Sequence, residues 1–150
     1  MENVLSEIFD LGSIKIDLEG KTKEAVFLEL IEAIAVVCPK SDRAMMFKAI
    51  EEREKKMSTG IKEGVAIPHA FCEGIGRIAG AIGISKQGIE YGALDNRPVH
   101  VIFLLVSQQA DENHLHVLNS IFKLVKSEAL SLIKNAKNAE EIHALLSGVH

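Results

Sequence analysis

The sequence predicts an α/β fold in which helices cover both faces of a small β-sheet, within a single domain over residues 1–150. Two observations lead to this prediction. One strand pattern near the N-terminus is followed by two helical patterns, and three further strand patterns are followed by two or three helical patterns. A connection made of two helices, together with a helical tail, has to cover the two faces of the sheet.

The first half of the chain contains one expected strand and two expected helices. Residues 13–20 alternate apolar and polar side chains, which is typical of a half-buried strand. Helices are expected over 21–38, with Thr22 as the N-cap, and over 41–56, with Ser41 as the N-cap. The expected buried stripes are Val26, Leu30, Ile34 and Val37 in the first helix and Met46, Phe47 and Ile50 in the second.

The second half of the chain supplies most of the expected sheet. Strands are expected over 64–69, 77–85 and 98–107, and the last is so continuously apolar that it should lie at the centre of the sheet. Residues 88–98 are expected to form a loop, with a short strand at Ile89–Tyr91 as an alternative. From Asp111 to the end the pattern is helical, and "NAEE" at 138–141 resembles a capping box that opens a final helix.

The charge and composition exclude several classes of protein. The net charge is −4 and the 17 basic residues are spread along the chain, whereas a nucleic-acid surface needs clustered Lys and Arg. No apolar run approaches the roughly 18 residues that a membrane span requires. Cys38 and Cys72 are isolated thiols, and no signal-peptide pattern opens the chain. We therefore expect a cytoplasmic protein with no membrane insertion and no bound metal or cofactor.

His69 is the first candidate for chemistry, because it follows a proline and an apolar run just before a glycine-containing loop. A neutral imidazole has one nitrogen with a lone pair, which is a competent nucleophile toward phosphorus. Backbone N–H groups of the preceding loop, at Ser58, Thr59 and Gly60, would bind the phosphoryl oxygens. The sequence has no Walker A motif or kinase loop, so the phosphoryl group should come from another protein and not from ATP.

Arg53 is the second candidate, because it continues the buried stripe of its helix where an apolar residue would be ordinary. The spacing from Met46 and Ile50 leads to Arg53 or Glu54. A planar guanidinium in that position suits phosphate oxygens. The alternative interpretation is a basic side chain that complements the helix C-terminus or extends its charged end to solvent.

Two histidines in "NHLHVL", His114 and His116, raise the question of a shared metal ion. The segment has helical spacing, and residues two apart on a helix point about 200° away from each other, so they cannot share one site. His114 lies on the apolar side and should be directed inward, while a buried structural or capping histidine remains the alternative. For His100, at the start of an apolar strand, a structural role is favoured.

The segment Glu52–Ala70, "EREKKMSTGIKEGVAIPHA", resembles the phosphorylation-site signature of enzyme IIA domains of the fructose/mannitol class in the bacterial phosphoenolpyruvate-dependent sugar phosphotransferase system. The resemblance covers nearly the whole chain. It implies a three-layer α/β/α sandwich around a small mixed sheet. It also implies that His69 is phosphorylated, that Arg53 is the active-site arginine and that His114 is the second active-site histidine.

The resemblance implies a phosphoryl donor, either phosphorylated HPr or its nitrogen-branch counterpart, and leaves three functions open. A nitrogen-regulatory protein would change its binding partners with the phosphorylation state of His69, and we favour this function because the sequence contains neither a IIB domain nor membrane spans. A sugar-transport component would pass the phosphoryl group to a IIB domain. The third possibility is an interaction domain that is never phosphorylated, which the joint presence of His69, Arg53 and His114 argues against.

Overall fold

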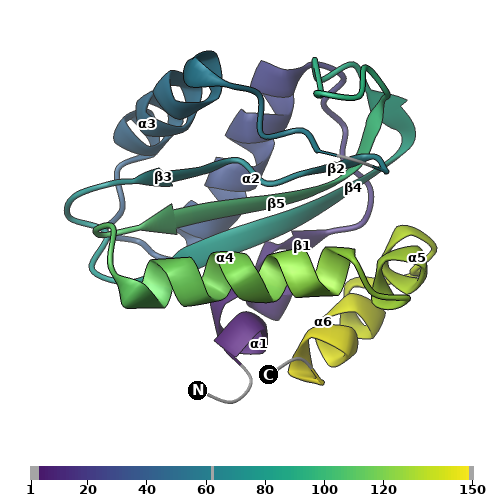
Figure 1. Ribbon diagram of the computed structural model, residues 1–150. Coiled ribbons are helices and arrows are strands. Elements are labelled where there is room, and N and C mark those ends of the chain that lie inside the picture. Colours follow the sequence, from purple (N-terminus) through teal and green to yellow (C-terminus); the bar gives the residue numbers. More distant parts are fainter. Residues whose placement is uncertain (1–3, 62, 149–150) are drawn as a thin grey trace.

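The computed structural model describes residues 4–61 and 63–148, which form three layers, with helices on both faces of a mixed sheet (Figure 1). This confirms the α/β/α prediction. The helices are α1 (Val4–Ile8), α2 (Lys23–Val37), α3 (Arg43–Lys56), α4 (Glu112–Val125), α5 (Ala129–Lys134) and α6 (Ala139–Ser147), with a 3₁₀ turn at Leu11–Ser13. The strands are β1 (Ile14–Lys15), β2 (Val65–Ala66), β3 (His69–Phe71), β4 (Ala79–Ile89) and β5 (Val99–Ser107).

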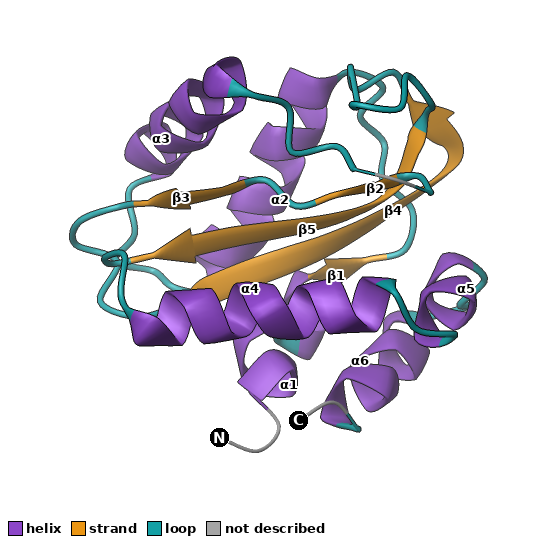
Figure 2. Cartoon of the chain, viewed as in Figure 1, coloured by secondary structure: helices purple, strands orange, loops and turns teal. Residues whose placement is uncertain are grey.

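The sheet is organised around the long antiparallel pair β4 and β5 (Figure 2). The short strand β1 runs parallel to β4, while β2 and β3 both run parallel to β5 along its other edge. Strand β5 therefore lies inside the sheet, as its apolar sequence predicts. Its alternate residues face two separate cores, Val101, Phe103 and Leu105 in one and Ile102, Leu104 and Val106 in the other.

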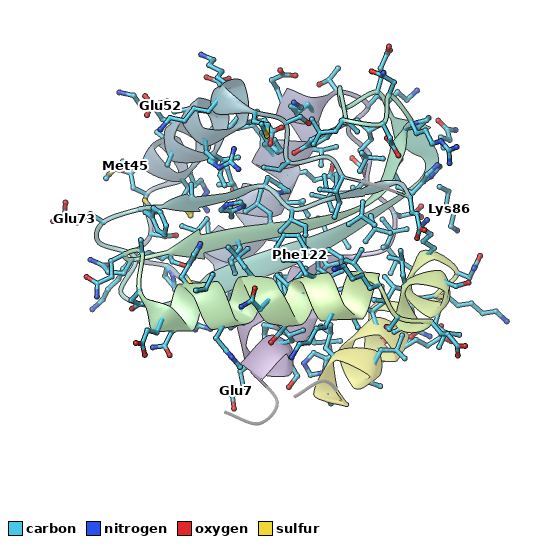
Figure 3. All side chains as sticks on the ribbon, viewed as in Figure 1. Glu7, Met45, Glu52, Glu73, Lys86 and Phe122 are labelled. Atoms are coloured by element: carbon cyan, nitrogen blue, oxygen red, sulfur yellow. The ribbon has the colours of Figure 1, made fainter. Side chains whose placement is uncertain are left out.

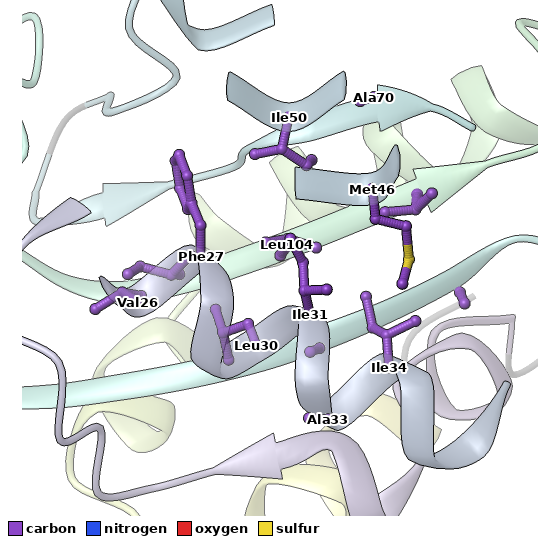
Figure 4. Close-up of a cluster of buried hydrophobic side chains, with 14 of the residues drawn as sticks. Val26, Phe27, Leu30, Ile31, Ala33, Ile34, Met46, Ile50, Ala70 and Leu104 are labelled. Carbon is purple, nitrogen blue, oxygen red and sulfur yellow. The ribbon is translucent and has the colours of Figure 1, made fainter. Parts of the chain in front are cut away.

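The two cores correspond to the two helical layers. On one face α2 and α3 pack against the sheet, and Figure 4 shows Phe27, Ile31 and Ile34 of α2 close to Met46 and Ile50 of α3 and to Leu104. On the other face α1, α4, α5 and α6 contribute apolar side chains. The expected stripes of the first two helices are mostly buried, except that Val37 and Phe47 are only half-buried.

Capping residues decide where the helices begin. Thr22 caps α2 as predicted, since its hydroxyl accepts a hydrogen bond from the Ala25 N–H at 3.1 Å. Asn138 likewise caps α6 by accepting from the Glu141 N–H at 2.9 Å. The prediction of Ser41 as the cap of α3 is wrong. Asp42 is the cap, because its carboxylate accepts from the Met45 N–H at 3.1 Å, while the Ser41 hydroxyl donates to the Cys38 carbonyl.

The strand boundaries differ from the prediction in three places. The strand expected over 13–20 is reduced to β1. The strand expected over 64–69 is interrupted at Ile67–Pro68, because proline has no N–H to donate to a ladder, and pairing resumes at His69. Strand β4 continues to Ile89 through a register irregularity after Ile84, so part of the expected loop is strand. The break at Pro68 has a local cause, whereas the extents of β1 and β4 depend on pairing partners distant in the sequence.

Candidate phosphoryl-transfer site

A pocket of about 480 Å³ is lined by residues of α3, β3 and the first turns of α4. Figure 1 shows β3 between α3 and the N-terminal half of α4, at one end of the sheet. The wall of the pocket contains all three side chains that the sequence predicts to act together, Arg53, His69 and His114. The other lining residues are Ala49, Glu52, Lys56, Ala70, Phe71 and Leu118. Residues separated by more than sixty positions thus line one cavity, in which polar side chains stand beside apolar ones.

His69 is held at the first position of β3, after the break at Pro68. The strand is fixed to β5 by pairing of His69 with Leu105, whose N–H donates to the Pro68 carbonyl at 2.9 Å. Nδ1 of His69 lies 2.8 Å from the Ile67 carbonyl oxygen. A carbonyl can only accept, so Nδ1 carries the hydrogen, and in the neutral ring Nε2 keeps its lone pair.

Nε2 of His69 is open to the pocket. It makes no hydrogen bond with the described part of the chain, and among those residues no buried side-chain nitrogen or oxygen lacks a partner. Burial lowers the pKa of His69 from its usual 6.5, and the Arg53 charge lowers it further, although the bond to Ile67 acts in the opposite direction. The ring is therefore neutral at pH 7, with its unprotonated nitrogen facing the cavity.

His114 faces His69 across the pocket, with 5.8 Å between the ring centroids. It lies in the first turn of α4, where its N–H donates to the capping Asp111 carboxylate at 3.0 Å. The side chain is buried whereas His116 is exposed, which confirms the prediction from helical phase. Burial lowers the pKa of His114, and His69 lowers it further. The exposed ring of Phe71 packs on the His114 ring, with 4.7 Å between the two ring centroids.

Arg53 lies in the last turn of α3, half-buried, and its guanidinium donates to the Met57 carbonyl at 3.0 Å. The side chain thus bonds the helix end, as one sequence interpretation has it, and also lines the pocket, while its binding of phosphate stays a prediction. Arg53 takes part in none of the ion pairs found among the described residues. Lys56 adds a second positive charge, and Glu52, labelled on α3 in Figure 3, adds one negative charge.

The structure does not bring Ser58, Thr59 and Gly60 into this pocket. The Thr59 N–H donates to the Glu54 carboxylate at 2.8 Å, and the Gly60 N–H donates to the Ser58 hydroxyl at 3.1 Å. The expectation that Thr59 and Gly60 offer free N–H groups to phosphate is therefore corrected. Gly60 is needed for packing instead, because an added Cβ would lie 2.7 Å from the Ala93 Cβ.

A buried carboxylate that the sequence analysis did not assign, Glu54, fixes this loop. It accepts hydrogen bonds from the Thr59 N–H and hydroxyl and from the Tyr91 hydroxyl at 3.0 Å, and it pairs with Lys23 at 3.1 Å. Burial raises the pKa of Glu54, but the bonds from Thr59 and Lys23 outweigh that effect and lower it overall. Its place on the inward stripe of the helix was the only sequence signal, since Lys23 and Tyr91 are 31 and 37 positions away.

We expect Glu54→Gln to destabilise the fold by roughly 2–4 kcal/mol, because an amide cannot replace a carboxylate that accepts from four donors. Urea denaturation at pH 7 measures the loss, with the exposed Glu52→Gln as the matched control. The folded-state pKa of Glu54 lies below its ordinary 4.5, so its contribution should persist above pH 4.5 and disappear as the pH falls further. Equal midpoints for the two variants would contradict this account.

Comparison with known proteins agrees with the geometry. The model of the family described as "Phosphoenolpyruvate-dependent sugar phosphotransferase system, EIIA 2" matches residues 7–149. A nitrogen regulatory protein of Pseudomonas aeruginosa is 29% identical over 147 residues, covering 97% of this chain and 96% of that protein. The crystal structure of nitrogen regulatory protein IIA-Ntr from Neisseria meningitidis superimposes with a TM-score of 0.86 at 30% identity, covering 95% of this chain and 99% of that one.

A sugar-specific relative shows a somewhat higher identity over its matching part. The fructose-specific EIIABC component of Bacillus subtilis is 34% identical over 143 residues, which are 95% of this chain, and the match spans only 22% of that longer protein. No helix within residues 4–61 and 63–148 is long and apolar enough to cross a bilayer. Matched over almost all of its length by one family model, this chain belongs to the EIIA type 2 family of the phosphoenolpyruvate-dependent sugar phosphotransferase system.

Proposed function

We propose that this protein is a phosphohistidine carrier, in which Nε2 of His69 accepts a phosphoryl group from an HPr-type phosphoprotein. The observation that carries the proposal is the tautomer of His69, whose Nδ1 is bonded to the Ile67 carbonyl and whose Nε2 opens into the pocket. The Nε2 lone pair forms the new N–P bond, and the electrons of the breaking bond return to the donor's own histidine nitrogen. No cofactor or net proton transfer is needed for this exchange.

The wall of the pocket supports this reaction electrostatically. Phosphoryl transfer depends mainly on positioning and on stabilising charge at the equatorial oxygens. Arg53 has no carboxylate partner among the described residues, so its guanidinium is available for those oxygens. Lys56 and His114 line the same cavity. The loop of Ser58, Thr59 and Gly60 lies outside the cavity. The phosphoryl oxygens are therefore bound by the side chains of Arg53, Lys56 and His114 and not by that loop.

We further propose that the carrier is of the nitrogen-regulatory type and works in the cytoplasm. Its support is the match to nitrogen regulatory proteins over nearly their full lengths, at 29% and 30% identity. A phosphoryl group adds nearly two negative charges to a pocket that holds Arg53 and Lys56. That reversal of charge gives a surface on which partner proteins can discriminate the two states. Free Cys38 and Cys72 fit a reducing compartment.

A sugar-transport component is the second candidate, and the 34% identity to a fructose-specific relative favours it. In that case the acceptor would be a IIB domain, to which His69 passes the phosphoryl group. The two candidate functions share the phosphorylation of His69 and differ only in which protein the phosphorylated form then binds.

Incubation with phosphorylated HPr, or with its nitrogen-branch counterpart, should label the protein with an acid-labile, base-stable phosphate. His69→Ala should abolish labelling while circular dichroism shows an intact fold, because the nucleophile is lost. His116→Ala is the matched control and should be labelled normally, since His116 is exposed outside the pocket. Undiminished labelling of His69→Ala would refute the carrier function, and an unlabelled wild type would favour an interaction domain that is never phosphorylated.

The proteins that bind the phosphorylated and the unphosphorylated form distinguish a regulatory function from a sugar-transport function. We expect the phosphorylated and the unphosphorylated wild-type protein to retain different proteins from a cytoplasmic extract of the native cell. Mass spectrometry identifies the retained proteins. The non-phosphorylatable His69→Ala variant should match the unphosphorylated form. Retention of a transporter regulator or a kinase by one state supports the regulatory function. Phosphoryl transfer from His69 to a purified sugar-specific IIB domain would instead establish the transport function.

A further inference from the structure

Ser107 occupies a position behind the pocket that the reaction described above does not explain. It is the last residue of β5 and is 1% exposed. Its backbone is fixed, because it pairs with Phe71 and its carbonyl accepts from the Cys72 N–H at 2.8 Å. Its hydroxyl oxygen lies 2.6 Å from Nδ1 of His114.

The direction of this hydrogen bond follows from the surroundings of the hydroxyl. In the described part of the chain, Nδ1 of His114 is the one hydrogen-bond partner of the Ser107 hydroxyl. If Nδ1 carried the hydrogen, the buried Ser107 hydroxyl would have no acceptor for its own hydrogen, which is costly. If Ser107 donates, both groups are satisfied. Nδ1 of His114 is then unprotonated, and the single hydrogen of the neutral ring is on Nε2.

Nε2 of His114 is the nitrogen that can reach a ligand. The ring lines the pocket, and Nε2 makes no hydrogen bond with residues 4–61 or 63–148. Since no buried side-chain nitrogen or oxygen there lacks a partner, Nε2 is accessible from the cavity. The 5.8 Å between the two rings brings the oxygens of a phosphoryl group on His69 into hydrogen-bonding range.

The two histidines are thus held in opposite tautomers by two different neighbours. The Ile67 carbonyl accepts from Nδ1 of His69, so that its Nε2 is a nucleophile. The Ser107 hydroxyl donates to Nδ1 of His114, so that its Nε2 is a donor. A lone pair and an N–H therefore face the same cavity, which is the combination that an attacking nitrogen and a negatively charged phosphoryl group require.

We propose that Ser107 is a positioning residue, whose hydroxyl holds His114 in the Nε2–H tautomer so that His114 donates a hydrogen bond to the phosphoryl group on His69. The proposal rests on the phosphohistidine function. Without the hydroxyl, the other tautomer of His114 becomes populated, and its Nε2 lone pair would face the phosphoryl oxygens and repel them. A serine that merely filled space would have no such effect on the ring.

Long-range ¹H–¹⁵N NMR of the intact, unphosphorylated wild-type protein at neutral pH reads both tautomers directly. We expect His114 to show a protonated Nε2 and a bare Nδ1. His69, with the reverse pattern, is the internal comparison. A protonated Nδ1 on His114 would overturn the proposal without any substitution being made.

The kinetic test compares Ser107→Ala with Ser107→Thr, which restores a hydroxyl. Loss of one hydrogen bond to a charged group should slow phosphoryl transfer within the donor complex by about tenfold, leaving donor affinity unchanged. Ser107→Thr should recover most of that rate. Ser120→Ala is the matched control, because Ser120 is 5% exposed and its hydroxyl donates only locally, to the His116 carbonyl at 3.0 Å.

The outcomes separate this inference from the function on which it rests. A wild type labelled on His69, together with a folded Ser107→Ala that keeps both its rate and the His114 tautomer, would overturn the role of Ser107 alone. A wild type that is never labelled would overturn the carrier function and this role with it. If Ser107→Ala does not fold, the near-isosteric Ser107→Cys, a weaker donor, should show an intermediate rate, and a wild-type rate would contradict the proposal.

Discussion

The site depends on one hydrogen bond, from Nδ1 of His69 to the carbonyl of Ile67. That carbonyl lies in the interruption between β2 and β3, which Pro68 imposes on the edge of the sheet. Pairing of β3 with β5 then fixes the histidine backbone immediately after the break. A proline, a break between two short strands and a carbonyl acceptor together determine which ring nitrogen is presented to the cavity.

The opposite wall of the pocket depends on a division of charge between two consecutive residues of α3. Glu54 turns toward the core, where Lys23 neutralises it and Thr59 and Tyr91 saturate its oxygens. Consecutive residues on a helix point in different directions, so Glu54 pairs with Lys23 in the interior while Arg53 lines the pocket. Within residues 4–61 and 63–148 the guanidinium has no ion-pair partner, and its positive charge at the pocket also helps to keep His69 neutral. The end of α3 therefore supplies both the carboxylate that fixes the following loop and the cation that lines the pocket.

Much of this arrangement follows from local patterns in the sequence. The apolar run 98–107 predicts the inner strand, and helical phase distinguishes the buried His114 from the exposed His116. His100 is structural, as predicted, since its Nδ1 lies 2.9 Å from the Ser85 carbonyl. The family resemblance supplied the roles of the site residues. Sequence patterns missed the features whose partners only the folded chain brings into contact. These features are the carboxylate of Glu54, the hydroxyl of Ser107 and the hydrogen bonds of the loop of Ser58, Thr59 and Gly60.

The central claim is that backbone geometry selects Nε2 of His69 as the phosphorylated atom. Two-dimensional ¹H–¹⁵N NMR of the phosphorylated, ¹⁵N-histidine-labelled protein, with coupling to ³¹P, identifies the nitrogen bonded to phosphorus. The account predicts phosphorus on Nε2, with Nδ1 still protonated and bonded to the Ile67 carbonyl. Phosphorus on Nδ1 of His69, or on a different residue, would contradict it.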